Sequence, residues 1–189
     1  MKIAIVNFSG RNNAGNCSRI SEYLREKLTY DNDVLVIKYS DYDIKSCSKC
    51  DYSCLNPNCH RCNNLDETNL VYNLIGKSDL VFFLLPIYSN YPCSNFFIFK
   101  ERSQSVIGNI MTNYNNTKKS FIFIANTGLN NLINIVNDES NAFNDFLILS
   151  TQAYKTKGFY GDLIDKKECI EKIDDYVKNV CNVLKNTKE

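Results

Sequence analysis

The sequence predicts an α/β fold of the doubly wound type, in which a five-stranded parallel sheet of order 2-1-3-4-5 carries helices on both faces. Continuous apolar runs are typical of strands that are buried on both faces. Segments with helical spacing separate these runs, and the alternation occurs five times in 189 residues, of which 44% are hydrophobic. We therefore expect a single domain over residues 1–189, with a cysteine-rich insertion at about 44–65.

The first third of the chain contains two predicted strands and a helix. The run KIAIVNF at 2–8 is apolar and β-branched, which predicts a buried strand. Residues 16–30 place apolar side chains at helical spacing from Ile20 to Leu28, which predicts a helix. The run DVLVIKY at 33–39 predicts the second strand.

The alternation resumes after the cysteine-rich segment. Residues 66–77 have apolar side chains on one helical face, and DLVFFLLP at 79–86 is the most hydrophobic run of the chain. We expect a helix over 66–77, a doubly buried strand over 79–86 and a further helix over 93–106. The run SFIFIA at 120–125 predicts the fourth strand.

The last third is predicted to contain a helix over 139–154, the fifth strand over 158–164 and an amphipathic helix over 167–184. The inner stripe of that last helix includes Ile173, Val177 and Val180.

Composition excludes several classes of function. The net charge is +1 and the pI is about 7.4, so there is no electrostatic case for nucleic acid or an anionic membrane surface as a partner. The N-terminal apolar run is too short for a signal peptide, and no run approaches the roughly 18–20 residues of a membrane span. We therefore expect a cytoplasmic protein, in which clustered cysteines more often bind metal than form disulfides.

Ligands of such sheets bind beyond the carboxyl ends of the strands, near the switch point between strands one and three. The loop after the first strand, SGRNNAGNCS, leads into a helix, and backbone N–H groups at a helix start bind anions. The alternative is a polar turn that only caps the helix. The candidate phosphate ligands in this loop are Ser9, Arg11, Gly15, Asn16, Cys17 and Ser18.

Two further loops follow strands at the same edge. PIYSNYP begins at the predicted switch point, and its aromatic and small polar residues suit the lining of a flat ring, although Tyr88 can also be read as a half-buried loop aromatic. After the fourth strand, an Asn-Thr-Gly stretch supplies hydrogen-bonding side chains, as many ordinary loops do. The candidates are Pro86, Ile87, Tyr88, Ser89 and Asn90 in the second loop and Asn126, Thr127 and Gly128 in the third.

Five of the nine cysteines lie in the stretch CSKCDYSCLNPNCHRC. Thiolates at such spacing bind iron–sulfur clusters or zinc, and free thiols or disulfides are the other possibilities. A four-thiolate zinc site would use the two CxxC pairs. The candidate metal ligands are Cys47, Cys50, Cys54, Cys59 and Cys62.

The first loop resembles the GSPRxxGNT-type phosphate loop of the flavodoxin-like NAD(P)H-dependent FMN reductases. Ser9, Arg11, Gly15 and Asn16 match that pattern, and Cys17 replaces its threonine. The second loop is similar to that family's PxY motif, which is followed by a helix ending in a K-x-F-I-D-R-like stretch. Pro86, Tyr88 and Arg102 match, Glu101 replaces the aspartate and Phe97 the lysine. The resemblance implies that about 86–90 contact the isoalloxazine of FMN.

The cysteine segment is similar to the compact motif of iron–sulfur flavoproteins, a branch of the same fold that holds a [4Fe-4S] cluster between strand two and helix two. That motif is roughly CxxCxxC with a fourth cysteine a few residues later. Here one extra residue precedes Cys54 and a fifth thiol is present, which leaves open which four would bind.

The resemblance implies an FMN-binding oxidoreductase that passes electrons from NAD(P)H through flavin, with or without an iron–sulfur cluster, to an acceptor that the sequence does not name. The cofactor carries the chemistry, so no catalytic side chain is expected. The partners would be a small-molecule or protein redox partner, and relatives are usually homodimers or homotetramers. The alternative function is a zinc-stabilised or thiol redox-sensing binding protein on the same fold, without NAD(P)H turnover.

Overall fold

The computed structural model describes residues 1–11, 14–48, 50–56, 62–126, 132–158 and 160–186. Its parallel strands are ordered β2-β1-β3-β5-β6, and a short antiparallel strand, β4, pairs with β3. Counted by the parallel strands alone, this is the predicted order 2-1-3-4-5. The strands are β1 (Lys2–Asn7), β2 (Asp33–Lys38), β3 (Leu80–Tyr88), β4 (Tyr91–Pro92), β5 (Lys118–Ala125) and β6 (Leu147–Ser150).

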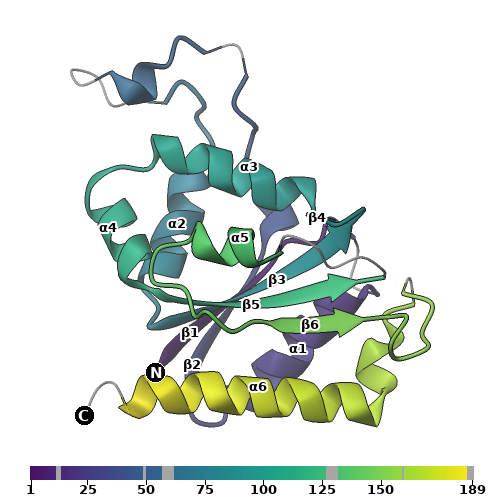
Figure 1. The fold of residues 1–189 in the computed structure, drawn as a ribbon. Helices are drawn as coiled ribbons and strands as arrows, with labels where there is room; N and C mark the ends of the chain where they lie inside the picture. The colour runs from purple at the N-terminus through teal and green to yellow at the C-terminus, as the bar shows by residue number, and fades with distance from the viewer. Residues whose placement is uncertain (12–13, 49, 57–61, 127–131, 159, 187–189) are drawn as a thin grey trace.

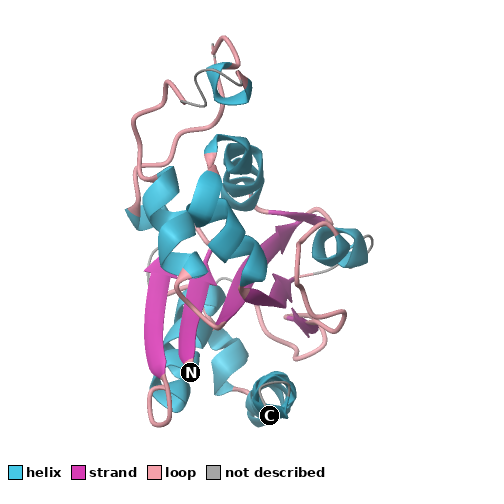
Figure 2. Ribbon diagram, turned by 90° about the vertical axis from the view of Figure 1, so that its left-hand side faces the viewer, coloured by secondary structure: helices cyan, strands magenta, loops and turns pink. Residues whose placement is uncertain are grey.

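Helices cover both faces of the sheet, as Figure 1 shows. On one face lie α2 (Thr68–Gly76), α3 (Ser94–Arg102), α4 (Gly108–Asn116) and α5 (Leu132–Asn137); on the other lie α1 (Asn16–Leu28) and α6 (Lys167–Asn186). Short 3₁₀ turns are η1 (Tyr39–Asp41), η2 (Ser53–Leu55), η3 (Ser103–Ser105) and η4 (Asp162–Asp165). The view in Figure 2 separates the two helical layers.

The core consists of two apolar clusters, one on each face of the sheet. Strand residues alternate between them: Ala4 and Val6 belong to one cluster, whereas Ile3 and Ile5 belong to the other. This period of two is the pattern of a strand whose two faces are both covered. The sheet is therefore covered on both faces where the loops at its carboxyl edge begin.

The structure corrects the predicted elements of the last third. The fifth strand is β6, Leu147–Ser150, inside the segment predicted to be helical, and it pairs with Ile122 to Ala125 of β5. Residues 147–150 form a strand because they can pair with the open edge of β5, and this tertiary pairing overrides the local helical pattern of the segment. The predicted strand over 158–164 is wrong because Gly158 and Gly161 both have positive φ, and the chain forms η4 there. Helices α4 and α5 were not predicted.

The cysteine segment leaves the body between η1 and α2, at about the predicted boundaries. Figure 1 shows it extending beyond α3, away from the sheet. Within the described part of the chain, no helix has both the length and the apolar character that crossing a membrane requires.

Candidate functional site

A cavity of about 100 Å³ lies at the carboxyl edge of the sheet, between the segments that follow β1 and β5 and the end of β3. Pro86 to Tyr88 were predicted as a loop but form the last residues of β3. Nine of the fourteen predicted ligand-binding residues line the cavity. These nine are Ser9, Arg11, Gly15, Asn16, Cys17, Pro86, Ile87, Tyr88 and Asn126. Thr127 and Gly128 lie outside the described residues, and Ser18, Ser89 and Asn90 do not line the cavity.

The turn after β1 is fixed by the side chain of Asn7, which is buried at the end of the strand. Its Oδ1 accepts a hydrogen bond of 2.9 Å from the Ser9 backbone N–H, and its Nδ2 donates to the Ser18 hydroxyl at 3.1 Å. The Ser9 Oγ in turn accepts from the Arg11 N–H at 3.2 Å. Ser9 is thereby held at the cavity, whereas Ser18 is directed toward Asn7.

The start of α1 faces this turn. Its N-cap residue is Gly15, and among the described residues no side chain caps the helix there. These groups and the helix dipole favour an anion. Burial raises the pKa of the Cys17 thiol far above its ordinary value, so Cys17 adds no negative charge. The donors therefore fit a phosphate. At about 100 Å³ the cavity is smaller than small-molecule sites, which are about 300–1,000 Å³, so it suits only the phosphorylated end of a larger ligand.

Asn16 joins this loop to the segment after β6. Its Nδ2 donates to the Gly158 carbonyl at 3.1 Å, and its Oδ1 accepts from the Leu163 N–H at 3.0 Å. Arg19, one turn later, donates to the Gly161 carbonyl at 2.7 Å. The Asn16 side chain thus positions the loops of the cavity, a role that the sequence did not reveal.

The second loop is a tight β-hairpin. Tyr88 pairs with Tyr91, and the two residues between them, Ser89 and Asn90, have φ of 49° and 70°. Positive φ at both central positions is typical of the turn that joins antiparallel strands. Tyr88 is 52% exposed, so part of its ring lines the cavity and part faces solvent. Burial raises the pKa of its hydroxyl, which keeps Tyr88 neutral.

The third loop and the segment after β6 complete the cavity. The Asn126 Oδ1 accepts a hydrogen bond of 3.0 Å from the Thr151 hydroxyl. It also lies close to Gly158, because a Cβ added to Gly158 would be only 2.4 Å from this oxygen. Sequence reasoning missed Ile124 and Gly158 as lining residues. Ile124 is an ordinary strand residue in sequence, and Gly158 fell within a segment that was predicted to be a strand, so no local pattern pointed to either.

Four of the five candidate metal ligands line one small cavity of about 20 Å³, here called the cysteine cup. They are Cys47, Cys50, Cys54 and Cys62, whereas Cys59 lies outside the described residues. Among the residues that the structure describes, no three such side chains are gathered closely enough to hold a metal ion. The donor type fits a soft metal or a cluster, but the described thiols would have to move closer together to bind one.

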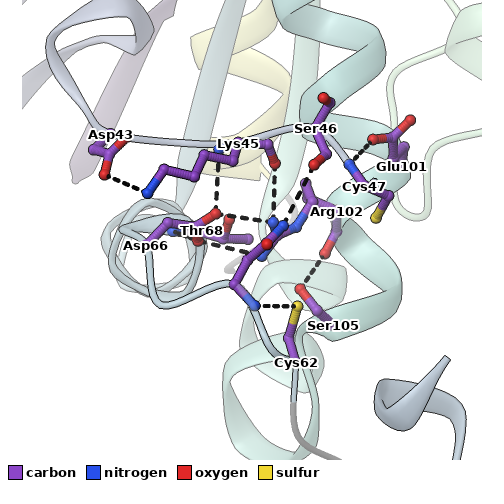
Figure 3. A network of polar contacts seen from close by, with 11 residues as sticks. Asp43, Lys45, Ser46, Cys47, Cys62, Asp66, Thr68, Glu101, Arg102 and Ser105 are labelled. Atoms are coloured by element: carbon purple, nitrogen blue, oxygen red, sulfur yellow. Dashed lines mark hydrogen bonds and ion pairs between the residues drawn. The ribbon is translucent and has the colours of Figure 1, made fainter. Parts of the chain in front are cut away.

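Both stems of the cysteine loop are held by the end of α3 (Figure 3). The Arg102 guanidinium donates to the Lys45 carbonyl at 2.9 Å and to both Asp66 oxygens at 2.9 and 3.2 Å. Glu101 accepts from the Cys47 N–H. Arg102 and Asp66 are each 1% exposed at their side chains, so this is a buried ion pair.

The charge of Asp66 is fully compensated. Burial would raise the pKa of its carboxyl, but hydrogen bonds from Thr68 and Lys45 and the Arg102 charge outweigh burial and lower that pKa. The pKa of Cys47 shifts in the opposite direction, because burial and the nearby Glu101 raise the pKa of its thiol. The stem is therefore ionised where it is clamped at Asp66, whereas the raised pKa of the Cys47 thiol favours its neutral form.

No protein-family model matches this chain, and no curated protein matches it. Solved structures do. An FMN-dependent NADH-azoreductase from Bacillus anthracis str. Ames Ancestor is similar at a TM-score of 0.60 and 10% identity, over 100% of both chains. FerB, a flavoenzyme NAD(P)H:(acceptor) oxidoreductase from Paracoccus denitrificans, is similar at 0.53 and 13%, over 94% of this chain and 95% of FerB.

A third similar structure is RosB with bound 8-demethyl-8-formylriboflavin-5'-phosphate, at a TM-score of 0.57 and 18% identity. The match covers 79% of this chain and 65% of RosB. Together with the sheet order, these likenesses confirm the predicted flavodoxin-like fold.

Proposed function

We propose that this protein is an FMN-dependent oxidoreductase that takes electrons from NAD(P)H. One observation carries the proposal: the segments that follow β1 and β5 and the end of β3 border a cavity at the start of α1, at the edge where ligands of this fold bind. The similar solved structures include an FMN-dependent NADH-azoreductase and an NAD(P)H:(acceptor) oxidoreductase, which supports the same cofactor and electron donor here.

In this proposal each loop has its own task. The N–H groups at the start of α1 and the Ser9 hydroxyl hold the phosphate. The hairpin at Tyr88 lies beside the flavin ring, and Asn126 offers its amide to a ring edge. Bound FMN supplies two-electron redox chemistry, so the chain contributes position and polarity rather than an acid or a base.

The phosphate site is tested by Ser9→Asp, with Ser9→Asn as the neutral control of nearly equal size. A carboxylate about 4 Å from a phosphate costs about 4 kcal/mol at an effective dielectric of about 20, or roughly a thousandfold in affinity. FMN binding is measured by quenching of flavin fluorescence. If Ser9→Asp binds FMN as well as Ser9→Asn does, the phosphate does not lie at Ser9.

We further propose that the cysteine cup holds a [4Fe-4S] cluster. Support comes from the four thiols that line one cavity and from the preference of clusters for thiolate ligands. Zinc is the alternative, because two CxxC pairs also suit a four-thiolate zinc site. Anaerobic purification followed by an absorption spectrum and by iron and zinc analysis separates these cofactors.

Cys50→Ala should remove iron and leave FMN content unchanged. Cys169→Ala is the control, because Cys169 is fully buried in α6 on the opposite face of the sheet and should change neither. Equal iron in wild type and Cys50→Ala would exclude a cluster at that thiol. A colourless protein with stoichiometric zinc would instead favour the zinc-stabilised or thiol-sensing binding protein.

We also propose a homodimer or homotetramer. Tyr88 and Tyr91 of the hairpin and Phe97 of α3 are exposed by 52%, 63% and 48%, and aromatic side chains are enriched at subunit interfaces. Light scattering after gel filtration measures the assembly, and a monomeric holoprotein would exclude it.

A further inference from the structure

A second cavity, of about 400 Å³, lies between the first two turns of α1 and the carboxyl ends of β1 and β2. Its volume is within the range of small-molecule sites, which are about 300–1,000 Å³. Like the flavin cavity, it lies at the edge of the sheet where ligands of this fold bind. The two cavities share no lining residue, so they are separate sites.

The inner stripe of α1 is polar at this cavity. Ser21 is 3% exposed and belongs to the same buried stripe as Ile20 and Leu24. A helix that packs on a sheet normally has apolar side chains along that stripe. Ser21 and Ser18 instead line the cavity opposite Val36 of β2. The packing of α1 on the sheet therefore does not explain why hydroxyl groups stand here.

The Ser21 hydroxyl is buried, and its Oγ has no hydrogen-bond partner among the described residues. A serine inside a helix can bond to the carbonyl of the preceding turn or to solvent, but this buried hydroxyl does neither. Buried polar groups are nearly always satisfied. The orphan hydroxyl therefore indicates a partner from outside the chain.

The charges of the lining indicate that this partner is neutral. Each ionic side chain of the cavity is already paired with an opposite charge of the chain. A charged ligand would lose its hydration without gaining a new counter-ion, which makes its burial costly. The pairs are Arg19 with Asp165, Glu22 with Arg25 and Lys38 with Asp41.

The remaining groups suit a ligand that carries hydroxyls. The Ser18 Oγ accepts a hydrogen bond of 3.1 Å from Asn7 Nδ2, which leaves its O–H able to donate. The Ser21 hydroxyl is able both to donate and to accept. Val36 packs against the apolar cluster of this face and offers an apolar wall. Hydroxyl groups on a short carbon chain match this combination of donors, acceptors and apolar surface.

We propose that this cavity binds a small neutral polyol, with hydroxyls on Ser21 and Ser18 and its carbon chain against Val36. The site goes beyond the proposed FMN function and does not depend on it, because no residue of the flavin cavity takes part.

The test is a titration of the purified full-length protein with ribitol, followed by the amide resonances in nuclear magnetic resonance spectra. The control ligand is 1,5-pentanediol, which has the same carbon chain without the inner hydroxyls. Ribitol should shift the resonances of the first two turns of α1 with a Kd in the millimolar range. The diol should bind at least about tenfold more weakly, because it lacks the hydroxyls that the site would bond.

Ser21→Ala removes only the hydroxyl and should raise the ribitol Kd by about three- to tenfold. Without ligand, the same variant should unfold at the same denaturant concentration as the wild type or at a higher one, because it removes a buried hydroxyl that has no partner. Ser94→Ala is the matched control, because Ser94 is exposed at the start of α3 and lies outside the cavity. Its ribitol Kd should equal that of the wild type.

Absence of ribitol-dependent shifts in the wild type would overturn the proposal. Equal affinities for ribitol and the diol, or an unchanged ribitol Kd in Ser21→Ala, would overturn it as well. A ligand-free Ser21→Ala variant that unfolds at a lower denaturant concentration than the wild type would also count against it, because the hydroxyl would then already be satisfied by ordered water.

Discussion

Gly161, in the segment after β6, lies against Ala14 in the loop between β1 and α1. Its φ is +72°, and a Cβ there would lie 2.3 Å from the Ala14 carbonyl oxygen and 2.8 Å from Arg19 Cδ. The left-handed conformation costs an alanine about 1–2 kcal/mol. The contact with the backbone of Ala14 forces a shift that adds about 1–3 kcal/mol, as overpacking does.

We therefore expect Gly161→Ala to lower the free energy of unfolding by about 2–5 kcal/mol. Gly108→Ala is the matched control: its φ is +62°, but a Cβ there would meet nothing within 4 Å. That variant should lose only the conformational cost of about 1–2 kcal/mol. Denaturant unfolding measures both losses.

FMN binding separates the two variants further. Because Ala14 belongs to the loop that leads into α1, its displacement should weaken FMN binding about tenfold or more in Gly161→Ala, which corresponds to about 1.4 kcal/mol. Gly108→Ala should bind FMN like the wild type. Equal losses of stability and equal FMN affinities in the two variants would refute the claim that Gly161 supports the phosphate loop.

Three further predictions concern single side chains. Asp66→Asn leaves Arg102 buried without its counter-charge and should lower the free energy of unfolding by about 3–5 kcal/mol in denaturant titrations, whereas Asp165→Asn breaks the exposed pair with Arg19 and should change it little. Burial lowers the pKa of Lys119 to about 8 in the folded protein, below the ordinary pKa of lysine. Between these two pKa values the unfolded chain binds one more proton than the folded chain, so the free energy of unfolding should rise by about 1 kcal/mol per pH unit relative to Lys119→Met. A difference in the free energy of unfolding between the two proteins that does not change with pH would contradict this. Cys17→Ser supplies a stronger donor at the start of α1 and should tighten FMN binding about threefold or more in fluorescence titrations, while Cys181→Ser on α6 should leave it unchanged.

Sequence patterns predicted the sheet well where burial is complete. The runs around Ile5 and Phe82 are apolar on both faces, and only a strand covered by helices on both sides satisfies them. Strand order followed from the alternation of strands and helices. The same patterns failed at β6, which is four residues long and half-buried, because its pairing with β5 is a tertiary effect that no local pattern records.

The candidate site was predictable to the extent that it is built from strand ends. Ser9 and Asn126 follow buried strands and Tyr88 ends one, so the order of the sheet alone brings them to one edge. Gly158 and the tethering role of Asn16 were not predictable, since both depend on a contact between segments about 140 residues apart. A single sequence contains no periodicity that links such distant loops.

Helix α3 connects the two proposed sites physically. At its start, Cys93 and Asn95 both donate to the Phe8 carbonyl, which precedes the phosphate loop. At its end, Arg102 holds both stems of the cysteine loop. Nine helical residues span about 13 Å, and α3 packs its Phe96 and Phe99 into the core cluster of that face. The segment that follows β1 and both stems of the cysteine loop are therefore bonded to opposite ends of the same helix.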